Sequence, residues 1–179
     1  FEIEPAEDGH EWEPEGAHEA PPTKGIMSLY NEGDRRRWYW RCACCKTPFE
    51  GDFEHLVWDK TIADPFRASQ TVRLKCPNED CGFEHTHEAN IESGQPGKVG
   101  LNRSGVWVRE GQYLDDNGLI CGTPRQSTTA SFWLKGVAAA FASWQSLVFK
   151  YLKAMNTLRR TGSDGDLKTT INVDQGHPY

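Results

Sequence analysis

Two short cysteine pairs carry the most specific chemistry in the sequence. The first is a C-x2-C step and the second a C-x4-C step, thirty residues apart, formed by Cys42, Cys45, Cys76 and Cys81. Four thiolates offered as two local pairs suit a tetrahedral Zn²⁺ ion, at Zn–S distances of about 2.3 Å. Folding then has to bring together only two short loops. The spacing therefore predicts a closed, structural zinc site.

Neighbouring side chains leave the ligand set open. Cys44 lies inside the first pair and either competes for a ligand position or points away. His85 and His87 follow Cys81 and can replace a sulfur if the wider loop does not close. A disulfide and buried free thiols are the other interpretations of the pairs. Six cysteines in 179 residues are, however, too sparse for a disulfide scaffold.

An arginine run precedes the first cysteine pair and continues into Trp38-Tyr39-Trp40. On a strand, alternation places Arg35 and Arg37 on one face, and Arg36 on the other face with the two tryptophans. Guanidinium groups bind phosphates and aromatic rings stack on bases, so Arg35, Arg36 and Arg37 are candidate nucleic-acid contacts. In the alternative that we favour, the tryptophans pack beneath the zinc site and the arginines bind nearby acidic residues.

Motifs of catalytic sites do not occur in the sequence. It contains no G-x-x-x-x-G-K-[ST] phosphate-binding loop, no G-x-S-x-G turn and no H-E-x-x-H helix. The close acidic pairs, Asp115-Asp116 and Asp164/Asp166, lie where turn formation and helix capping account for them. We therefore expect this segment to have no catalytic residue and no small-molecule substrate.

Short strands must position the cysteine pairs. Residues 35–41 predict a strand that ends at the first pair, with Pro48-Phe49 and 53–59 as its antiparallel return. Residues 71–75 predict a strand that leads into the second pair, and 83–91 lead away from it. Together these segments make the hairpins of a zinc ribbon, with residues 60–70 as a loop between them.

The second half of the chain predicts a small β element and two helices. Strands at 105–109 and 118–121 flank a turn-forming Asp-Asp-Asn-Gly segment. A long helix begins after Ser143, a good N-cap, because large apolar residues then recur with a helical period until Gly162 ends it. A shorter helix is expected over 164–172. The fold class is therefore α+β, with zinc-ribbon hairpins and one long C-terminal amphipathic helix.

Charge is unevenly distributed along the chain. The net charge is −6, but residues 1–23 hold eight acidic residues and no Lys or Arg, which leaves 18 acidic against 20 basic residues elsewhere. We expect four parts: an acidic extended leader (1–23), a zinc-ribbon region (24–92), a connector (93–104), and a β-hairpin with C-terminal helices (105–179). Because no apolar run approaches ~20 residues, we expect no membrane partner.

Several motifs together resemble a known family. One is the arginine and tryptophan block from Gly33 to Trp40 together with the first cysteine pair. The others are Pro21 to Ile26, Leu29 to Asn31, Ala130 to Gly136, Phe141 to Trp144, and Thr170 to Tyr179. In this order they are similar to the middle of lambda-type phage terminase large subunits. Two features depart from that pattern. Cys44 disturbs a knuckle that usually holds a single pair, and Asp174-Gln175-Gly176-His177 replaces a more acidic ending.

The resemblance implies a fragment of a DNA-packaging motor subunit. In that family an N-terminal ATPase translocates DNA, and a C-terminal metal-dependent nuclease cuts concatemers into genome lengths. The fragment would cover the ATPase tail, a zinc-ribbon insertion and the connector to the nuclease. Its partners would be double-stranded DNA and other terminase subunits, in the bacterial host cytoplasm. A free-standing, non-enzymatic zinc-ribbon module that recruits a protein partner is the alternative function.

Overall fold

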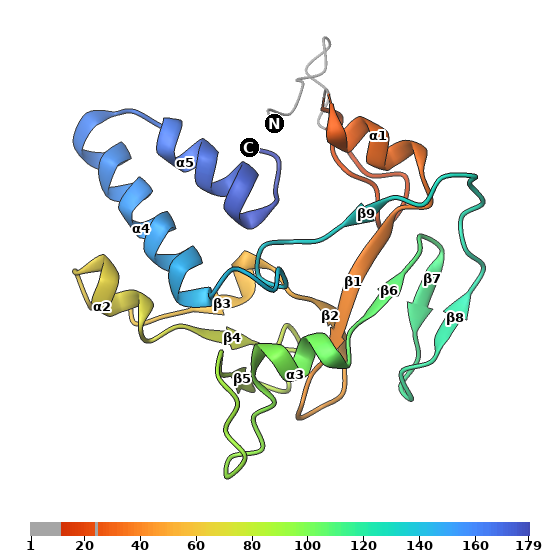
Figure 1. Ribbon diagram of the computed structural model, residues 1–179, viewed down its shortest axis with the longest axis horizontal. Coiled ribbons are helices and arrows are strands. Elements are labelled where there is room, and N and C mark those ends of the chain that lie inside the picture. Colours follow the sequence, from red (N-terminus) through yellow and green to blue (C-terminus); the bar gives the residue numbers. More distant parts are fainter. Residues whose placement is uncertain (1–11, 24) are drawn as a thin grey trace.

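The computed structural model describes residues 12–23 and 25–179, and its architecture is α+β, as the sequence predicts (Figure 1). Helices α4 and α5 form one side of the molecule, and the β7–β8 hairpin lies on the opposite side. The elements in chain order are α1 (Ile26–Glu32), β1 (Arg36–Arg41), β2 (Pro48–Glu50), the 3-10 helix η1 (Phe53–His55), β3 (Leu56–Val57), α2 (Pro65–Ser69), β4 (Arg73–Lys75), β5 (Glu84–His85), α3 (Gly97–Arg103), β6 (Val106–Val108), β7 (Gln112–Leu114), β8 (Ile120–Gly122), β9 (Phe132–Trp133), α4 (Trp144–Thr161), α5 (Gly165–Thr169) and the π-helix η2 (Thr170–Gln175).

Strand β1 is the centre of the main sheet. It pairs antiparallel with β2, where Trp40 lies opposite Phe49. Its other antiparallel partner is β6, where Trp38 lies opposite Trp107. It also pairs in parallel with β9, where Arg37 lies opposite Trp133. Because β9 comes from the second half of the chain, this sheet joins the two halves.

The predicted return strand is confirmed at Pro48-Phe49, which lie in β2 beside β1, but it is wrong over 53–59. The left-handed backbone at Lys46 (φ 64°) turns the chain back immediately after the first cysteine pair. Residues 53–55 form η1, and β3 pairs with β4 in a second sheet, with Leu56 opposite Leu74. Strand β5 completes that sheet on the other side of β4, with His85 opposite Leu74.

Two segments expected to lack helices each contain one. In the predicted loop, Asp64 caps α2 by accepting a hydrogen bond from the Arg67 N–H (2.8 Å), and Pro65 is the first helical residue. The predicted connector contains α3, which has no side-chain cap and so gives no signal in the sequence. The predicted hairpin also differs: β6 joins β1, while β7 pairs with β8.

The long helix α4 is confirmed with its predicted ends. The Ser143 side chain accepts a hydrogen bond from the Ser146 N–H (3.1 Å), and Gly162 ends the helix in the left-handed conformation (φ 75°). The second helix is longer than predicted, because α5 continues directly into η2. None of the helices in the described part of the chain has both the length and the apolar character needed to span a bilayer.

A single main core draws on both halves of the chain. Its buried residues are Trp40, Cys42, Phe49, Leu56, Val72, Leu74, Cys76, Leu101, Val137, Ala138, Trp144, Leu147 and Val148. Side chains from β1, the second sheet, α3 and α4 therefore pack together around two of the cysteines. A smaller cluster beside α1 contains Ala20, Met27, Tyr30 and Trp133.

Residues 12–23 form no helix or strand, yet they pack against α1. The Asn31 amide exchanges two hydrogen bonds with the backbone of Ala20 (2.9 and 2.8 Å), and the Tyr30 hydroxyl donates to the His18 carbonyl (2.9 Å). His18 and Ala20 are buried. This part of the expected leader is thus attached to the body, and residues 1–11 lie outside the described residues.

Candidate metal centre

The first cysteine loop follows β1 without a break. The Cys42 N–H donates to the Thr47 carbonyl (3.0 Å), and the Lys46 N–H donates to the Cys42 carbonyl (3.1 Å). These two bonds close a tight turn, and the positive φ of Lys46 completes it. The turn brings Cys42 and Cys45 to the same side of the loop, facing the second pair.

The second cysteine loop has the same design despite its wider spacing. The Cys76 N–H donates to the Phe83 carbonyl (2.8 Å), and the Cys81 N–H donates to the Asn78 carbonyl (3.0 Å). Gly82 then takes a positive φ of 61°, which matches the role of Lys46 in the first loop. The Asn78–Cys81 bond shortens the loop, so no histidine is needed to replace a sulfur.

The four sulfurs gather into one group. All Sγ atoms lie within 4.8 Å of one another; Cys42 lies 3.8 Å from Cys81, and Cys45 lies 3.7 Å from Cys76. A regular tetrahedron with metal–sulfur bonds of about 2.3 Å has edges of about 3.8 Å. The arrangement therefore matches the dimensions of a tetrahedral thiolate site for a metal ion.

Electrostatics favours a cation at this group of sulfurs. Burial raises the pKa of the Cys42 and Cys76 thiols, because a thiolate is poorly solvated in the core. Burial has the same effect on Cys45, but hydrogen bonds from the Thr47 hydroxyl and N–H outweigh it and lower the pKa of Cys45 to about 6. A bound divalent cation favours the thiolate form of all four cysteines and offsets the cost of burying their negative charge.

The other predicted ligands lie outside this group. Cys44 is exposed, and within the described residues the cluster contains only the four paired cysteines. The His85 ring is enclosed by Phe83 and Phe49, with ring centroids 4.9 and 6.0 Å away. The His87 ring packs against Trp144 (5.2 Å). Both histidines therefore serve the core.

The first arginine of the run precedes the strand. Arg35 has a positive φ of 47° and a buried side chain. Its guanidinium forms ion pairs with Glu110 and Glu19, each at 3.2 Å, and donates to the Asn31 carbonyl (3.0 Å). These contacts tie the segment around Glu19 to α1 and to the end of β6.

The next two arginines also have acidic partners. Arg36 pairs with Asp34 at 2.8 Å, and Arg37 pairs with Glu50 at 3.3 Å. Their guanidinium carbons lie over the rings of the two β9 residues, 5.0 and 4.6 Å from the ring centroids. All three candidate nucleic-acid contacts are therefore engaged within the fold.

The two tryptophans of β1 share one hydrogen-bond acceptor. Trp38 and Trp40 both donate from Nε1 to the Asn102 side-chain oxygen, at 3.2 and 2.9 Å. The Asn102 amide then donates to the Ala138 carbonyl (2.9 Å). Asn102 lies in α3, a helix that the sequence did not reveal, so its role could not be predicted. Both tryptophans are thus tied to α3.

The sequence also did not predict a network of buried charged side chains. Asp52 Oδ1 lies 2.8 Å from His177 Nε2, and Lys135 contacts the other oxygen of Asp52 and lies 3.5 Å from Glu50. Burial alone raises the pKa of Asp52, but the His177 hydrogen bond and the Lys135 charge hold it below its usual range. Lys135 and His177 contributed to the family resemblance, but no local pattern linked them to Asp52.

Two family matches together span most of the chain. Residues 11–107 match the family described as "Phage terminase large subunit gpA, ATPase domain", and residues 129–179 match "Terminase large subunit gpA, endonuclease domain". No curated protein and no solved structure matches the chain. The ATPase match alone spans more than half of the sequence, in agreement with the resemblance noted from its motifs. The chain belongs to the phage terminase large subunit gpA family.

Proposed function

We propose that this segment is a metal-stabilised connector between the ATPase and endonuclease parts of a phage DNA-packaging terminase. One observation supports this most directly. Strand β1 lies in the segment that matches the ATPase domain, β9 lies in the segment that matches the endonuclease domain, and the two strands pair in one sheet. The junction between the two parts is therefore a folded unit and not a flexible linker.

Core packing supports the same role. Trp144, Leu147 and Val148 of α4 are buried in the same cluster as Trp40 and Cys42. The Asp52–His177 contact also joins the segment after β2 to the segment after η2. A force or a domain movement on one part would pass to the other through a packed interface of this kind.

We propose Zn²⁺ as the ion, held by Cys42, Cys45, Cys76 and Cys81. Soft thiolate ligands in a tetrahedral arrangement are typical of zinc sites in proteins. Because four protein sulfurs complete the coordination, no position is left for water or substrate, and the role of the ion is structural. ATP hydrolysis and DNA cleavage in the full protein would depend on residues outside this segment.

Double-stranded DNA and other terminase subunits are the partners that we propose for the full protein, in the host cytoplasm. The acidic partners of Arg35, Arg36 and Arg37 favour a structural role for the arginine run over phosphate contacts. Each guanidinium would have to leave an acidic residue before it could bind a phosphate.

Metal analysis of Cys76→Ser against Cys44→Ser tests the proposed site. Protein prepared without chelator should contain about one zinc ion per chain. Cys76→Ser should lose the ion and most of the stability, because a buried ligand is removed. Cys44→Ser is the matched control and should keep both, since its thiol is exposed and outside the cluster. Metal-free protein with unchanged thermal stability would overturn the proposal.

A further inference from the structure

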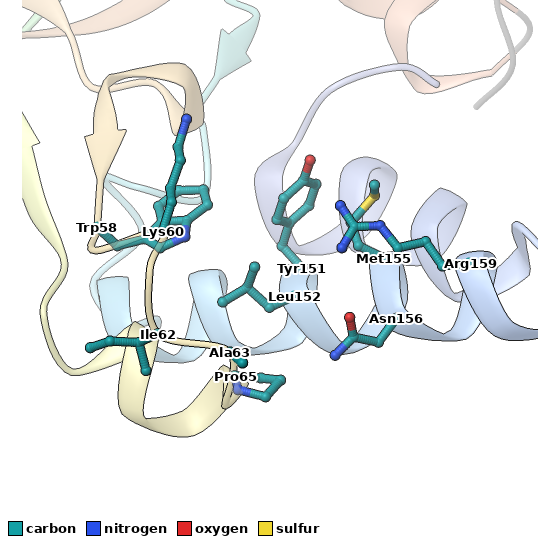
Figure 2. Close-up of a pocket in the computed structure, with 10 residues that line it drawn as sticks. All are labelled: Trp58, Lys60, Ile62, Ala63, Pro65, Tyr151, Leu152, Met155, Asn156 and Arg159. Carbon is teal, nitrogen blue, oxygen red and sulfur yellow. The ribbon is translucent and has the colours of Figure 1, made fainter.

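A groove on the side of the molecule away from β7 and β8 has no role in the proposed connector. It has a volume of about 400 Å³ and lies between the chain segment after β3 and the helix α4 (Figure 2). Its apolar walls are formed by Trp58, Ile62, Pro65, Tyr151, Leu152 and Met155. Figure 2 shows Leu152 in the middle of the groove, between the two walls.

Two cations border the groove. Lys60 lies on the wall that contains Trp58, and Arg159 lies on the α4 wall that contains Met155 (Figure 2). Both are exposed, and within the described residues neither side chain has an ion pair or a hydrogen bond. This differs from the run Arg35 to Arg37, in which each guanidinium has an acidic partner.

Further positive charge lies along the same helix. Lys153 and Arg160 line a second, smaller hollow next to the groove, and Asn156 belongs to both. Lys153 also lies over the Phe149 ring, 5.4 Å from its centroid. The surface of α4 around the groove is therefore basic, and the chain supplies no acidic side chain among the residues that line either hollow.

The aromatic rings of the groove are already packed on one another. Tyr151 lies 5.0 Å from Phe53 and 6.2 Å from Trp58, and Phe53 lies 6.2 Å from Trp58, all in tilted or edge geometry. The remaining floor is aliphatic. A stacked nucleic-acid base needs an open ring face, whereas an apolar side chain packs against aliphatic surface. The groove therefore favours a side chain of a protein.

We propose that this groove binds an acidic peptide segment of a partner protein. One bulky apolar side chain of the segment occupies the hollow around Leu152, and flanking carboxylates pair with Lys60 and Arg159. Burial of the apolar side chain provides affinity, while the charge pairs select acidic segments and speed association. Residues 1–11 of this chain have such a composition, with Phe1 and Ile3 among five acidic residues, so a second copy of the chain is one source to test.

A peptide array probed with the zinc-loaded protein tests the proposal. The array holds short peptides that vary independently in acidic and large apolar content. It also holds the peptide of residues 1–11 and a version with its acids replaced by Gln and Asn. Bound peptides should combine acidic residues with a large apolar one, and binding should weaken with added salt. Binding of the residues 1–11 peptide that is lost when its acids are replaced would support a second copy as the source, and no binding of that peptide would exclude a second copy.

Three variants show whether binding occurs in the groove. Ala63→Arg fills the hollow from an exposed position, and Lys60→Glu with Arg159→Glu reverses the charge of its border. The single variant and the double variant should each weaken peptide binding about tenfold or more. Arg103→Glu is the matched control, because it reverses an exposed charge on α3 and should leave binding unchanged.

Several outcomes would overturn the proposal. They are an array without bound peptides, bound peptides without acidic residues, and equal binding by the Ala63→Arg variant. A single-stranded or duplex oligonucleotide measured in parallel provides a further check. If the charge reversal abolishes oligonucleotide binding and leaves peptide binding intact, the groove serves nucleic acid instead.

Discussion

His85 is fully buried, with both ring nitrogens lacking a hydrogen-bond partner among the described residues. Rings of Phe49 and Phe83 enclose it. Burial lowers its pKa from the ordinary 6.5 to about 4, because the apolar surroundings cannot solvate an imidazolium. A neutral histidine at this position makes the stability of the fold depend on pH.

The first prediction concerns that pH dependence. Above about pH 6.5 the ring is neutral in both states, so its full contribution is present; as the pH falls towards 4, only the unfolded chain takes up the proton. The free energy of unfolding should drop by up to about 3 kcal/mol over this range. His85→Phe should flatten the slope. Urea unfolding of both proteins with excess zinc between about pH 7.5 and 5.5 measures it. Equal slopes would contradict the prediction.

The second prediction concerns Arg35. Arg35→Met leaves the buried carboxylate of Glu110 and the partly buried one of Glu19 without this partner, which should destabilise the fold by about 3 kcal/mol. Arg103→Met, at an exposed position, should change stability by less than about 0.5 kcal/mol. Thermal unfolding of the two variants compares them directly. A near-neutral Arg35→Met would show that the buried ion pairs do not hold the arginine run in place.

At the scale of elements, structures formed by neighbouring residues could be predicted from the sequence, whereas pairings between distant segments could not. Helix α4 was predictable because its period and both caps, Ser143 and Gly162, lie within the helix and its ends. The cysteine site was predictable for the same reason, since each pair is a local loop. Strand β9, in contrast, pairs with residues almost a hundred positions earlier, and the Asp52–His177 contact spans 125 positions. No local pattern in the sequence encodes such contacts.

Close backbone approach at Gly136 gives the third prediction. The Gly136 N–H donates to the Gln175 carbonyl (2.9 Å), and a Cβ at this position would lie 1.7 Å from the Asp174 carbonyl oxygen. Gly136→Ala should therefore push η2 off the segment after β9 and cost about 1–3 kcal/mol. Hydrogen exchange should speed up in residues 170–177.

A second glycine in the same region is the matched control for that experiment. A Cβ at Gly165, the first residue of α5, would meet nothing closer than the Ser163 hydroxyl at 4.0 Å. Gly165→Ala should leave hydrogen exchange in η2 unchanged and raise helix stability slightly. Equal effects of the two substitutions would mean that contact with Asp174 is not the cause.

At the scale of the whole molecule, the shared core predicts the result of metal removal. Cys42 and Cys76 belong to the same buried cluster as Trp144 and Leu147 of α4. A strong chelator should therefore expose β1 and α4 together, in one transition, rather than open the cysteine loops alone. Hydrogen exchange before and after chelation measures this. Continued protection of α4 beside exchanging cysteine loops would show two independent units.

The pairing of β9 with β1 also has a consequence for folding on the ribosome. Both cysteine loops are complete once Phe83 has been synthesised, whereas β1 gains its parallel neighbour only when Phe132 and Trp133 emerge. At typical rates of translation, the nascent chain waits roughly 3 to 10 seconds between the two events. Metal loading can thus precede closure of the sheet, and during that wait part of one edge of β1 is open to unintended strand pairing. A captured ion would hold the early half in place until its late partner arrives.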